Sequence, residues 1–239
     1  MKTGTFLLAL LAASTLGAEA PKQTDLFPLK SGNLKITFIG HGSLMLDWNG
    51  WIIHVDPFGQ QADYRALPKA DLILITHEHS DHLDPEAVAQ ISKQDTVIVA
   101  NAASARKLKG AQVLSNGEKT KVHGLAIEAV PAYNTTPGHT QYHPKGRDNG
   151  YVLGFGETRV YIAGDTENIP EMSRLAGIAV AFLPMNQPYT MTPEQAAAAA
   201  RSFRPKILYP YHYGDTDPQK LVAALKNSPG IEVRVRNLR

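Results

Sequence analysis

Residues 72–76 read Leu72-Ile73-Leu74-Ile75-Thr76, and the next six residues read His77-Glu78-His79-Ser80-Asp81-His82. The first part is a continuous apolar run, which is typical of a strand buried on both faces. Alternate side chains of an extended chain share a face, so His77, His79 and Asp81 point the same way, and His82 comes round as the chain turns. Imidazoles and a carboxylate together are ligands for a borderline divalent metal. The alternative is a solvated loop with histidines by chance, but three of the chain's nine His lie within these six residues.

Strands and helices alternate on both sides of this stretch. Asp84-Pro85-Glu86 combines an N-cap, a first-turn proline and an acidic first turn, and predicts a helix to about Ile91. Thr192-Pro193-Glu194-Gln195 is a capping box that predicts a second helix, to Phe203. The leading segment, residues 21–31, has no clear pattern and is expected to be loose.

One pattern occurs twice. Trp51–Asp56 and Arg159–Asp165 each form the second strand of a predicted hairpin and end in an acid, and the two acids lie 109 positions apart (165 − 56). The repetition predicts two similar halves packed face to face.

The His-x-His-x-Asp-His pattern of residues 77–82 resembles the signature of the metallo-β-lactamase superfamily. Four further segments resemble the family's conserved stretches: Gly40–Ser43, Val55–Pro57, Ala163–Thr166 and Pro210–Gly214. Within the superfamily the chain looks most similar to the branch of ascorbate-6-phosphate lactonase and N-acyl-phosphatidylethanolamine phospholipase D. The resemblance implies an α/β protein, an αββα sandwich of two packed mixed sheets flanked by helices.

The resemblance also implies a ligand set for two divalent metal ions, with zinc expected first and Mn or Fe as alternatives. His77, His79 and a third donor would hold one ion, and Asp165 would bridge to the other. The second ion would be held by Asp81, His82 and His212. Two such ions share a water and bring its pKa toward neutrality, which makes the chain a metal-dependent hydrolase using a metal-bridging hydroxide. We expect Asp81 to orient that hydroxide and receive its proton, and His41 to face the metals or to hydrogen-bond a carboxylate.

One departure from the family concerns the third donor of the first ion. Where a metal-binding His is expected, the chain has Pro131-Ala132-Tyr133-Asn134. Two histidines follow in the next loop, and we favour His143 over His139 because His143 stands beside the turn at Pro144. Otherwise Asn134 and a water fill the position. If both histidines are surface residues, the first ion is under-coordinated, and the alternative function is a metal-binding protein without turnover, a scaffold or a sensor.

Composition and the residue at position 165 limit the possible substrate classes. The absence of Cys excludes a β-lactamase of the type with a Cys ligand, and Asp165 argues against any antibiotic hydrolase, because those lack the bridging carboxylate. A net charge of +2 carries no field that would attract nucleic acid. A lactone, an ester or a phosphodiester remains as the small-molecule substrate. Tyr133, Tyr189 and Tyr213 lie near the predicted site loops and are candidates to donate to a developing oxyanion.

Residues 1–20 have the pattern of a signal peptide, with Lys2, an apolar run over residues 6–16 and Ala18-Glu19-Ala20 as the cleavage site. The run falls short of the ~20 apolar residues of a spanning helix, so no stable membrane anchor is expected. Residues 21–239 would then form one hydrolase domain that works in a periplasm or outside the cell. The sequence leaves the oligomeric state open.

Overall fold

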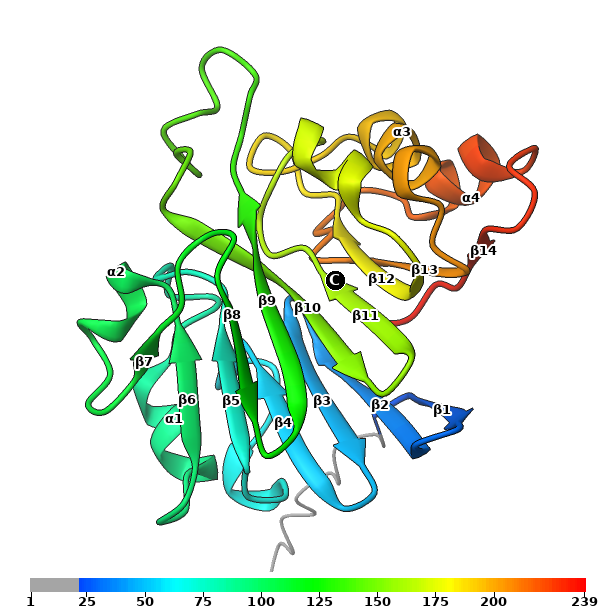
Figure 1. Ribbon diagram of the computed structural model, residues 1–239. Coiled ribbons are helices and arrows are strands. Elements are labelled where there is room, and N and C mark those ends of the chain that lie inside the picture. Colours follow the sequence, from blue (N-terminus) through cyan, green and yellow to red (C-terminus); the bar gives the residue numbers. More distant parts are fainter. Residues whose placement is uncertain (1–21) are drawn as a thin grey trace, which may run out of the picture.

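The computed structural model describes residues 22–239, so the expected signal peptide and its cleavage site lie outside the described part. Two seven-stranded mixed sheets pack against each other, with helices on their outer sides (Figure 1). The first sheet contains β1 (Thr24–Leu29), β2 (Gly32–Gly40), β3 (Ser43–Trp48), β4 (Trp51–Val55), β5 (Leu72–Ile75), β6 (Val97–Ala100) and β7 (Gln112–Val113). The second contains β8 (Lys119–Val122), β9 (Leu125–Ala132), β10 (Asp148–Phe155), β11 (Thr158–Ile162), β12 (Ile178–Pro184), β13 (Ile207–Tyr211) and β14 (Glu232–Val233). The helices are α1 (Pro85–Ile91), α2 (Ala102–Ala105), α3 (Pro193–Phe203) and α4 (Gln219–Leu225), with short 3₁₀ turns η1 (Tyr64–Ala66) and η2 (Pro170–Arg174). The predicted αββα sandwich is confirmed.

The two sheets repeat one plan. Each begins with four antiparallel strands and continues with three that are parallel to the fourth. β4 and β11 are the fourth strands of their sheets; Asp56 follows β4 directly, and Asp165 is the third residue after β11. The repeated strand-and-acid pattern therefore corresponds to two similar halves, as predicted.

The core explains why β5 is apolar at every position. Leu72 and Leu74 belong to the large apolar cluster between the sheets, while Ile73 and Ile75 belong to a second cluster. Val88 and Ile91 of α1 close that second cluster on the outside of the first sheet. Since β5 is anchored on both faces, the histidines that follow it start from a fixed point.

The two predicted helix starts are confirmed. The Asp84 carboxylate accepts from the backbone N–H groups of Glu86 and Ala87 at the start of α1. Thr192 and Gln195 form the reciprocal capping box of α3, which ends at Phe203. Within residues 22–239 no helix is long and apolar enough to span a bilayer.

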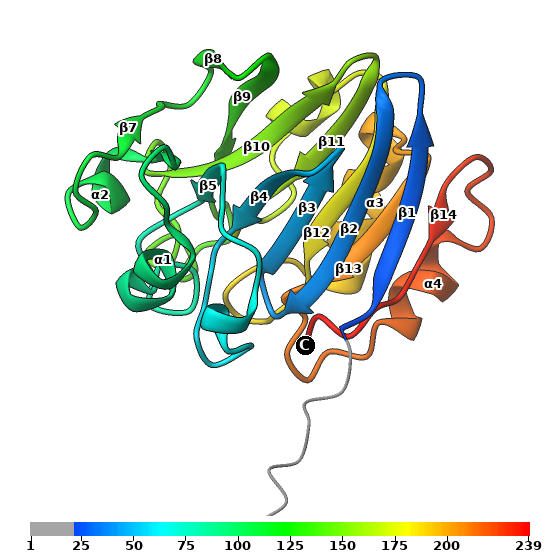
Figure 2. The same cartoon turned by 90° about the horizontal axis from the view of Figure 1, so that it is seen from below.

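The expectation of a loose leading segment is wrong. Residues 24–29 form β1, which pairs antiparallel with β2 at the edge of the first sheet and lies near the C-terminal segment (Figure 2). The Asp25 carboxylate accepts from both Nη2 and Nε of Arg236, at 2.8 and 3.1 Å, and from the hydroxyl of Tyr209. Pro28 argues against a strand when the sequence is considered alone, since proline cannot donate a backbone hydrogen bond. An edge strand tolerates it because one side of its backbone needs no partner. The tail contacts that fix β1 come from residues about 200 positions away.

Candidate metal centre

The eight residues predicted as metal ligands or catalytic groups lie at one edge of the two sheets. The residues come from the β2–β3 turn, from the segments that follow β5, β11 and β13, and from the loop between β9 and β10, which extends beyond the end of β9 (Figure 1). Because β5, β11 and β13 run in parallel parts of their sheets, their carboxyl ends present the following residues at that edge. The residues gathered there are His41, His77, His79, Asp81, His82, His143, Asp165 and His212.

Three imidazoles form what we call the first donor group: His77, His79 and His143. Their nearest ring nitrogens all lie within 4.8 Å of one another. The ring of His143 lies 5.0 Å from that of His77 and 4.9 Å from that of His79. The structure thus places the loop histidine that sequence analysis favoured beside the two strand-end histidines.

The second donor group consists of His41, Asp81, His82 and His212. Asp81 Oδ2 lies 3.0 Å from His41 Nε2 and 3.5 Å from His212 Nε2. Burial works to raise the pKa of Asp81, but the hydrogen bonds from His212 and His41 outweigh it and lower that pKa. The carboxylate is therefore ionised.

Asp165 lies between the two groups. Its Oδ2 is 3.5 Å from the Nε2 atoms of His143, His82 and His212, and 4.0 Å from that of His77. One buried carboxylate oxygen thus faces members of both groups at once. Burial would raise the pKa of Asp165, but the imidazoles around it lower that pKa well below the usual value.

Several buried atoms at the centre lack any hydrogen-bond partner among the described residues. They include Nε2 of His77, Nε2 of His82 and Oδ1 of Asp165. An unpaired buried polar atom costs about 1–3 kcal/mol, so a cluster of them calls for a ligand. The two Nε2 atoms lie 4.0 and 3.5 Å from Asp165 Oδ2, where the two groups meet. Imidazole nitrogens with carboxylate oxygens are what zinc and similar ions bind. The residues fit a divalent metal.

Asp56 orients two of the histidines from the side away from the centre. Its Oδ2 accepts from Nδ1 of His82 at 2.8 Å and from the Thr76 hydroxyl at 2.6 Å. Since the Thr76 proton goes to Asp56, the hydroxyl oxygen accepts from Nδ1 of His77, which lies 3.0 Å away. Both rings are thereby held with Nε2 toward the centre, the arrangement usual for metal-binding histidines.

These surroundings shift the pKa values of the His77 and His82 rings in opposite directions. Burial and the neighbouring His82 lower the pKa of His77 well below its usual value, so its ring is neutral. Burial also works to lower the pKa of His82, but the Asp165 and Asp56 carboxylates outweigh it and raise that pKa well above the usual value.

The β9–β10 loop is folded back so that His143 reaches the centre. The backbone N–H of Asn134 donates to the carbonyl of His143 at 2.8 Å, which pins the returning chain to the end of β9. Nδ1 of His143 donates to Asp148 Oδ2 at 3.0 Å. Arg147 donates to both oxygens of that carboxylate and to the carbonyl of Tyr142. At the other end of the loop the buried Glu167 carboxylate accepts from the backbone of residues 135 and 136.

Other candidates from the sequence lie away from the centre. His139 lies next to Glu167, with 3.3 Å between Nδ1 and Oε1, and the Tyr133 hydroxyl donates to Glu171. The Tyr213 hydroxyl donates to the carbonyl of Arg236. Asn134 is turned toward neighbouring loops rather than toward the histidines, with its side-chain N–H groups donating to the carbonyls of His139 and Tyr189.

A pocket of about 330 Å³ opens onto the centre, and of the three tyrosines named from the sequence only Tyr189 lines it. The other lining residues are His79, Ser80, Asp81, Tyr142, His143, Asp165, Asn186 and His212. Sequence reasoning missed Tyr142 and Asn186. For Tyr142 a signal existed, because it immediately precedes His143 in the loop that was predicted to reach the site.

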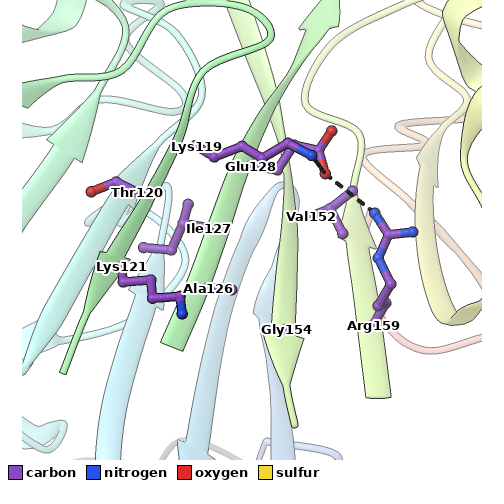
Figure 3. Close-up of a pocket in the computed structure, with 9 residues that line it drawn as sticks. All are labelled: Lys119, Thr120, Lys121, Ala126, Ile127, Glu128, Val152, Gly154 and Arg159. Atoms are coloured by element: carbon purple, nitrogen blue, oxygen red, sulfur yellow. Dashed lines mark hydrogen bonds and ion pairs between the residues drawn. The ribbon is translucent and has the colours of Figure 1, made fainter. Parts of the chain in front are cut away.

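A larger hollow of about 720 Å³ lies on the outer face of β8–β11 and contains none of the donor residues (Figure 3). Its floor includes Ala126, Val152 and Gly154. The cations of Lys119 and Arg159 are both paired with Glu128, at 3.4 and 3.3 Å. The chemistry of the molecule is therefore in the smaller pocket.

Comparisons with known proteins identify the family of this chain. The family described as "Beta-lactamase superfamily domain" matches residues 35–212, and the chain belongs to that family. A UPF0173 metal-dependent hydrolase of Pelotomaculum thermopropionicum is 30% identical over 222 residues, covering 84% of this chain and 96% of that protein. A relative of the same name from Thermus thermophilus is 33% identical over 199 residues, covering 77% of this chain and 86% of the relative.

Two solved structures extend the agreement to the fold. A protein of Parabacteroides distasonis, described as a candidate metal-dependent hydrolase, is 60% identical and superposes with a TM-score of 0.89, covering 91% of this chain and all of that one (100%). Igni18, a metallo hydrolase of Ignicoccus hospitalis, is 26% identical with a TM-score of 0.72, covering 86% and 95%. The chain is accordingly a metal-dependent hydrolase of the metallo-β-lactamase fold. Its place in the lactonase and phospholipase D branch stays a prediction.

Proposed function

We propose that this member of the β-lactamase superfamily hydrolyses a small anionic phosphodiester, with two divalent ions held by the two donor groups. The observation that supports it best is the position of Asp165, whose single Oδ2 lies 3.5 Å from imidazoles of both groups at the pocket. Such ions supply an acidified water and a Lewis acid, zinc being the first expectation and Mn or Fe the alternatives.

The residues would divide as follows. His77, His79 and His143 hold one ion, and Asp81, His82 and His212 hold the other. Asp165 serves both, because its oxygen faces both groups. Asp56 keeps the rings of His82 and His77 turned inward, directly and through Thr76.

Asp81 lines the pocket and is 39% exposed at its side chain, so it can reach a bound water. An ionised carboxylate accepts hydrogen bonds only, and we assign Asp81 the task of orienting the attacking water and receiving its proton. His41 is not among the residues that line the pocket. Burial lowers its pKa, so the neutral ring donates Nε2–H to Asp81, and we assign it a positioning role.

The charge balance favours a phosphodiester over a neutral ester or lactone. Two divalent ions bring four positive charges, against three carboxylates at Asp81, Asp165 and, behind His82, Asp56. The carboxylate behind His143, Asp148, is neutralised by its ion pair with Arg147. The remaining positive charge attracts an anion by Coulomb interaction. A pocket of about 330 Å³ suits a small molecule rather than a polymer.

The test is a hydrolysis assay with bis(para-nitrophenyl) phosphate and with a simple lactone. Protein loaded with zinc or manganese is expected to hydrolyse the diester faster than the lactone, to lose the activity on chelation and to regain it when the ion returns. Preferred hydrolysis of the lactone would overturn the phosphodiester assignment. Full metal content with no turnover of either compound would instead favour the metal-binding protein without turnover.

A further inference from the structure

Two tyrosines stand at the pocket that opens onto the donor groups. Tyr142 comes from the β9–β10 loop and Tyr189 from the segment between β12 and α3. Their ring centroids are 4.9 Å apart, with 73° between the ring planes. Tyr189 is 44% exposed, one of three large apolar side chains exposed to that degree within residues 22–239.

Both rings are carried on fixed backbone. The side-chain amide of Asn134 donates to the carbonyl of Tyr189 at 2.7 Å and to that of His139 at 3.2 Å, so it ties the two segments together. Arg147 donates to the carbonyl of Tyr142 at 2.8 Å, and the Tyr189 N–H donates to the carbonyl of Asn186 at 2.9 Å. Tyr189 is exposed and Tyr142 is half-buried beside it. An exposed aromatic ring on a fixed segment at a pocket marks a binding surface, because a solvent-facing position has no packing need for it.

Asn134 has a structural task at this place, because its amide is turned to the two loops and not to the histidines. Asn134 joins the loops that carry the two rings, and His143 from one of those loops takes the place beside His77 and His79. Asn134 thus links the loop that carries His143 and Tyr142 to the segment that carries Tyr189.

A polar group completes the surface. The Asn186 side chain lines the same pocket and makes no hydrogen bond within the described part of the chain. Gly214 lies against it: a Cβ at Gly214 would approach Asn186 Oδ1 to 2.8 Å. The missing side chain leaves this amide room in the pocket, where its donors are free for a ligand oxygen.

We propose that Tyr142, Tyr189 and Asn186 form the substrate subsite, and that the substrate is a phosphodiester with one planar aromatic substituent. This rests on the proposed hydrolysis. The rings would bind the aromatic substituent and Asn186 a phosphoryl oxygen. In the reaction a water oxygen forms a new P–O bond, the P–O bond to the aromatic substituent breaks, and the two protons of the water end on the departing oxygen and in solvent.

The test is direct binding, which needs no turnover. Phenyl phosphate and methyl phosphate carry the same charge and differ in the ring. By titration calorimetry on metal-loaded protein, phenyl phosphate is expected to bind ~10-fold more tightly, because only its ring can stack on the aromatic side chains. The double variant Tyr142→Ala/Tyr189→Ala should reduce that ratio to about one, while Tyr142→Phe/Tyr189→Phe, which keeps both rings, should retain it.

Asn186→Ala should weaken both phosphates alike, because its amide binds the shared group. Val113→Ala, an exposed apolar truncation on β7 with no place in the pocket, serves as the control. A ratio near one in the wild type, or a ratio unchanged in the Ala double variant when metal content and thermal unfolding match the wild type, overturns the subsite. Ring-dependent binding without hydrolysis of any diester would leave the subsite in place and overturn the proposed function, so the two failures are distinct.

Discussion

The first and second donor groups lie on either side of one carboxylate, yet they are built differently. The second group takes its members from the turn at His41, from the motif after β5 and from the end of β13, and it includes its own carboxylate, Asp81. The first group has imidazoles only, and its third member, His143, comes from the middle of a long loop. That loop keeps its position through Asn134, Asp148 and Arg147.

This difference predicts which of the two donor groups binds its ion less tightly. Residues at the ends of buried strands are positioned by the core, whereas a loop residue is positioned by the hydrogen bonds that hold the loop. A carboxylate within the second group also offsets the charge of a bound ion, and the first group shares only Asp165. We therefore expect the ion at the first group to be lost first.

Asp165→Asn should affect both groups together. The amide keeps the size of the side chain but brings no negative charge between the two sets of imidazoles. Even the loss of a group behind a ligand costs ~10–100-fold in metal affinity or activity, so we expect hydrolysis to fall by at least ~100-fold and both ions to bind more weakly. Metal analysis after dialysis and the diester assay measure this. Asp95→Asn, an exposed aspartate, is the control, and full metal content with wild-type turnover in Asp165→Asn would contradict the bridging role.

His143→Ala and His212→Ala should separate the two groups. Each removes one imidazole, from the first and the second group respectively. In a competition with a chelator, His143→Ala should weaken one ion by ~10-fold or more and leave the other near its wild-type affinity. His212→Ala should weaken the ion that His143→Ala spares. His139→Ala is the matched control on the same loop, and equal affinities for wild type and His143→Ala would show that the loop histidine holds no metal.

Asp148→Asn tests the support of the first group without touching a donor. The amide can still accept from His143, but it loses the ion pair in which Arg147 binds both carboxylate oxygens. We expect ~10-fold weaker binding of the ion that His143→Ala affects. Asp56→Asn should differ by weakening both ions, because Asp56 orients His82 directly and His77 through Thr76. If Asp148→Asn weakened both ions equally, the separate support of the first group would be refuted.

His54→Gln should leave metal binding and hydrolysis unchanged, since this buried ring on β4 donates to the carbonyl of Pro68 and belongs to neither group. Its effect is on stability against acid. Burial lowers the pKa of His54 from 6.5 to about 4. As the pH falls below 6.5, His54 becomes protonated in the unfolded chain, but in the folded chain it stays neutral until about pH 4. The free energy of unfolding therefore decreases as the pH is lowered through this window, by up to about 3 kcal/mol.

Urea unfolding of the metal-free protein between about pH 7 and about pH 4.5 measures this slope. The wild type should lose more stability than His54→Gln over that range. Identical slopes would mean that the acid sensitivity arises elsewhere, including in the donor groups themselves.

The direction of the motif side chains, the two helix starts and the repeated half could all be predicted from local sequence. The apolar run of β5 and the alternation after it predicted that His77, His79 and Asp81 share a face, because side-chain direction in a strand is set by the two-residue period. The capping residues Asp84 and Thr192 marked helix starts for an equally local reason, since a cap bonds to N–H groups two or three residues on. The repeated strand ending in Asp56 or Asp165 predicted two similar halves.

The third member of the first donor group depends on tertiary contacts, which the local sequence does not specify. Whether His143 or His139 turns inward depends on hydrogen bonds to Asn134 and Asp148, which no periodic pattern encodes. The pairing of Tyr142 with Tyr189 and the anchoring of β1 by Arg236 likewise join residues far apart in the chain. Such contacts form because the two sheets bring distant segments to one edge, and a segment's own sequence does not specify which neighbour it will meet there.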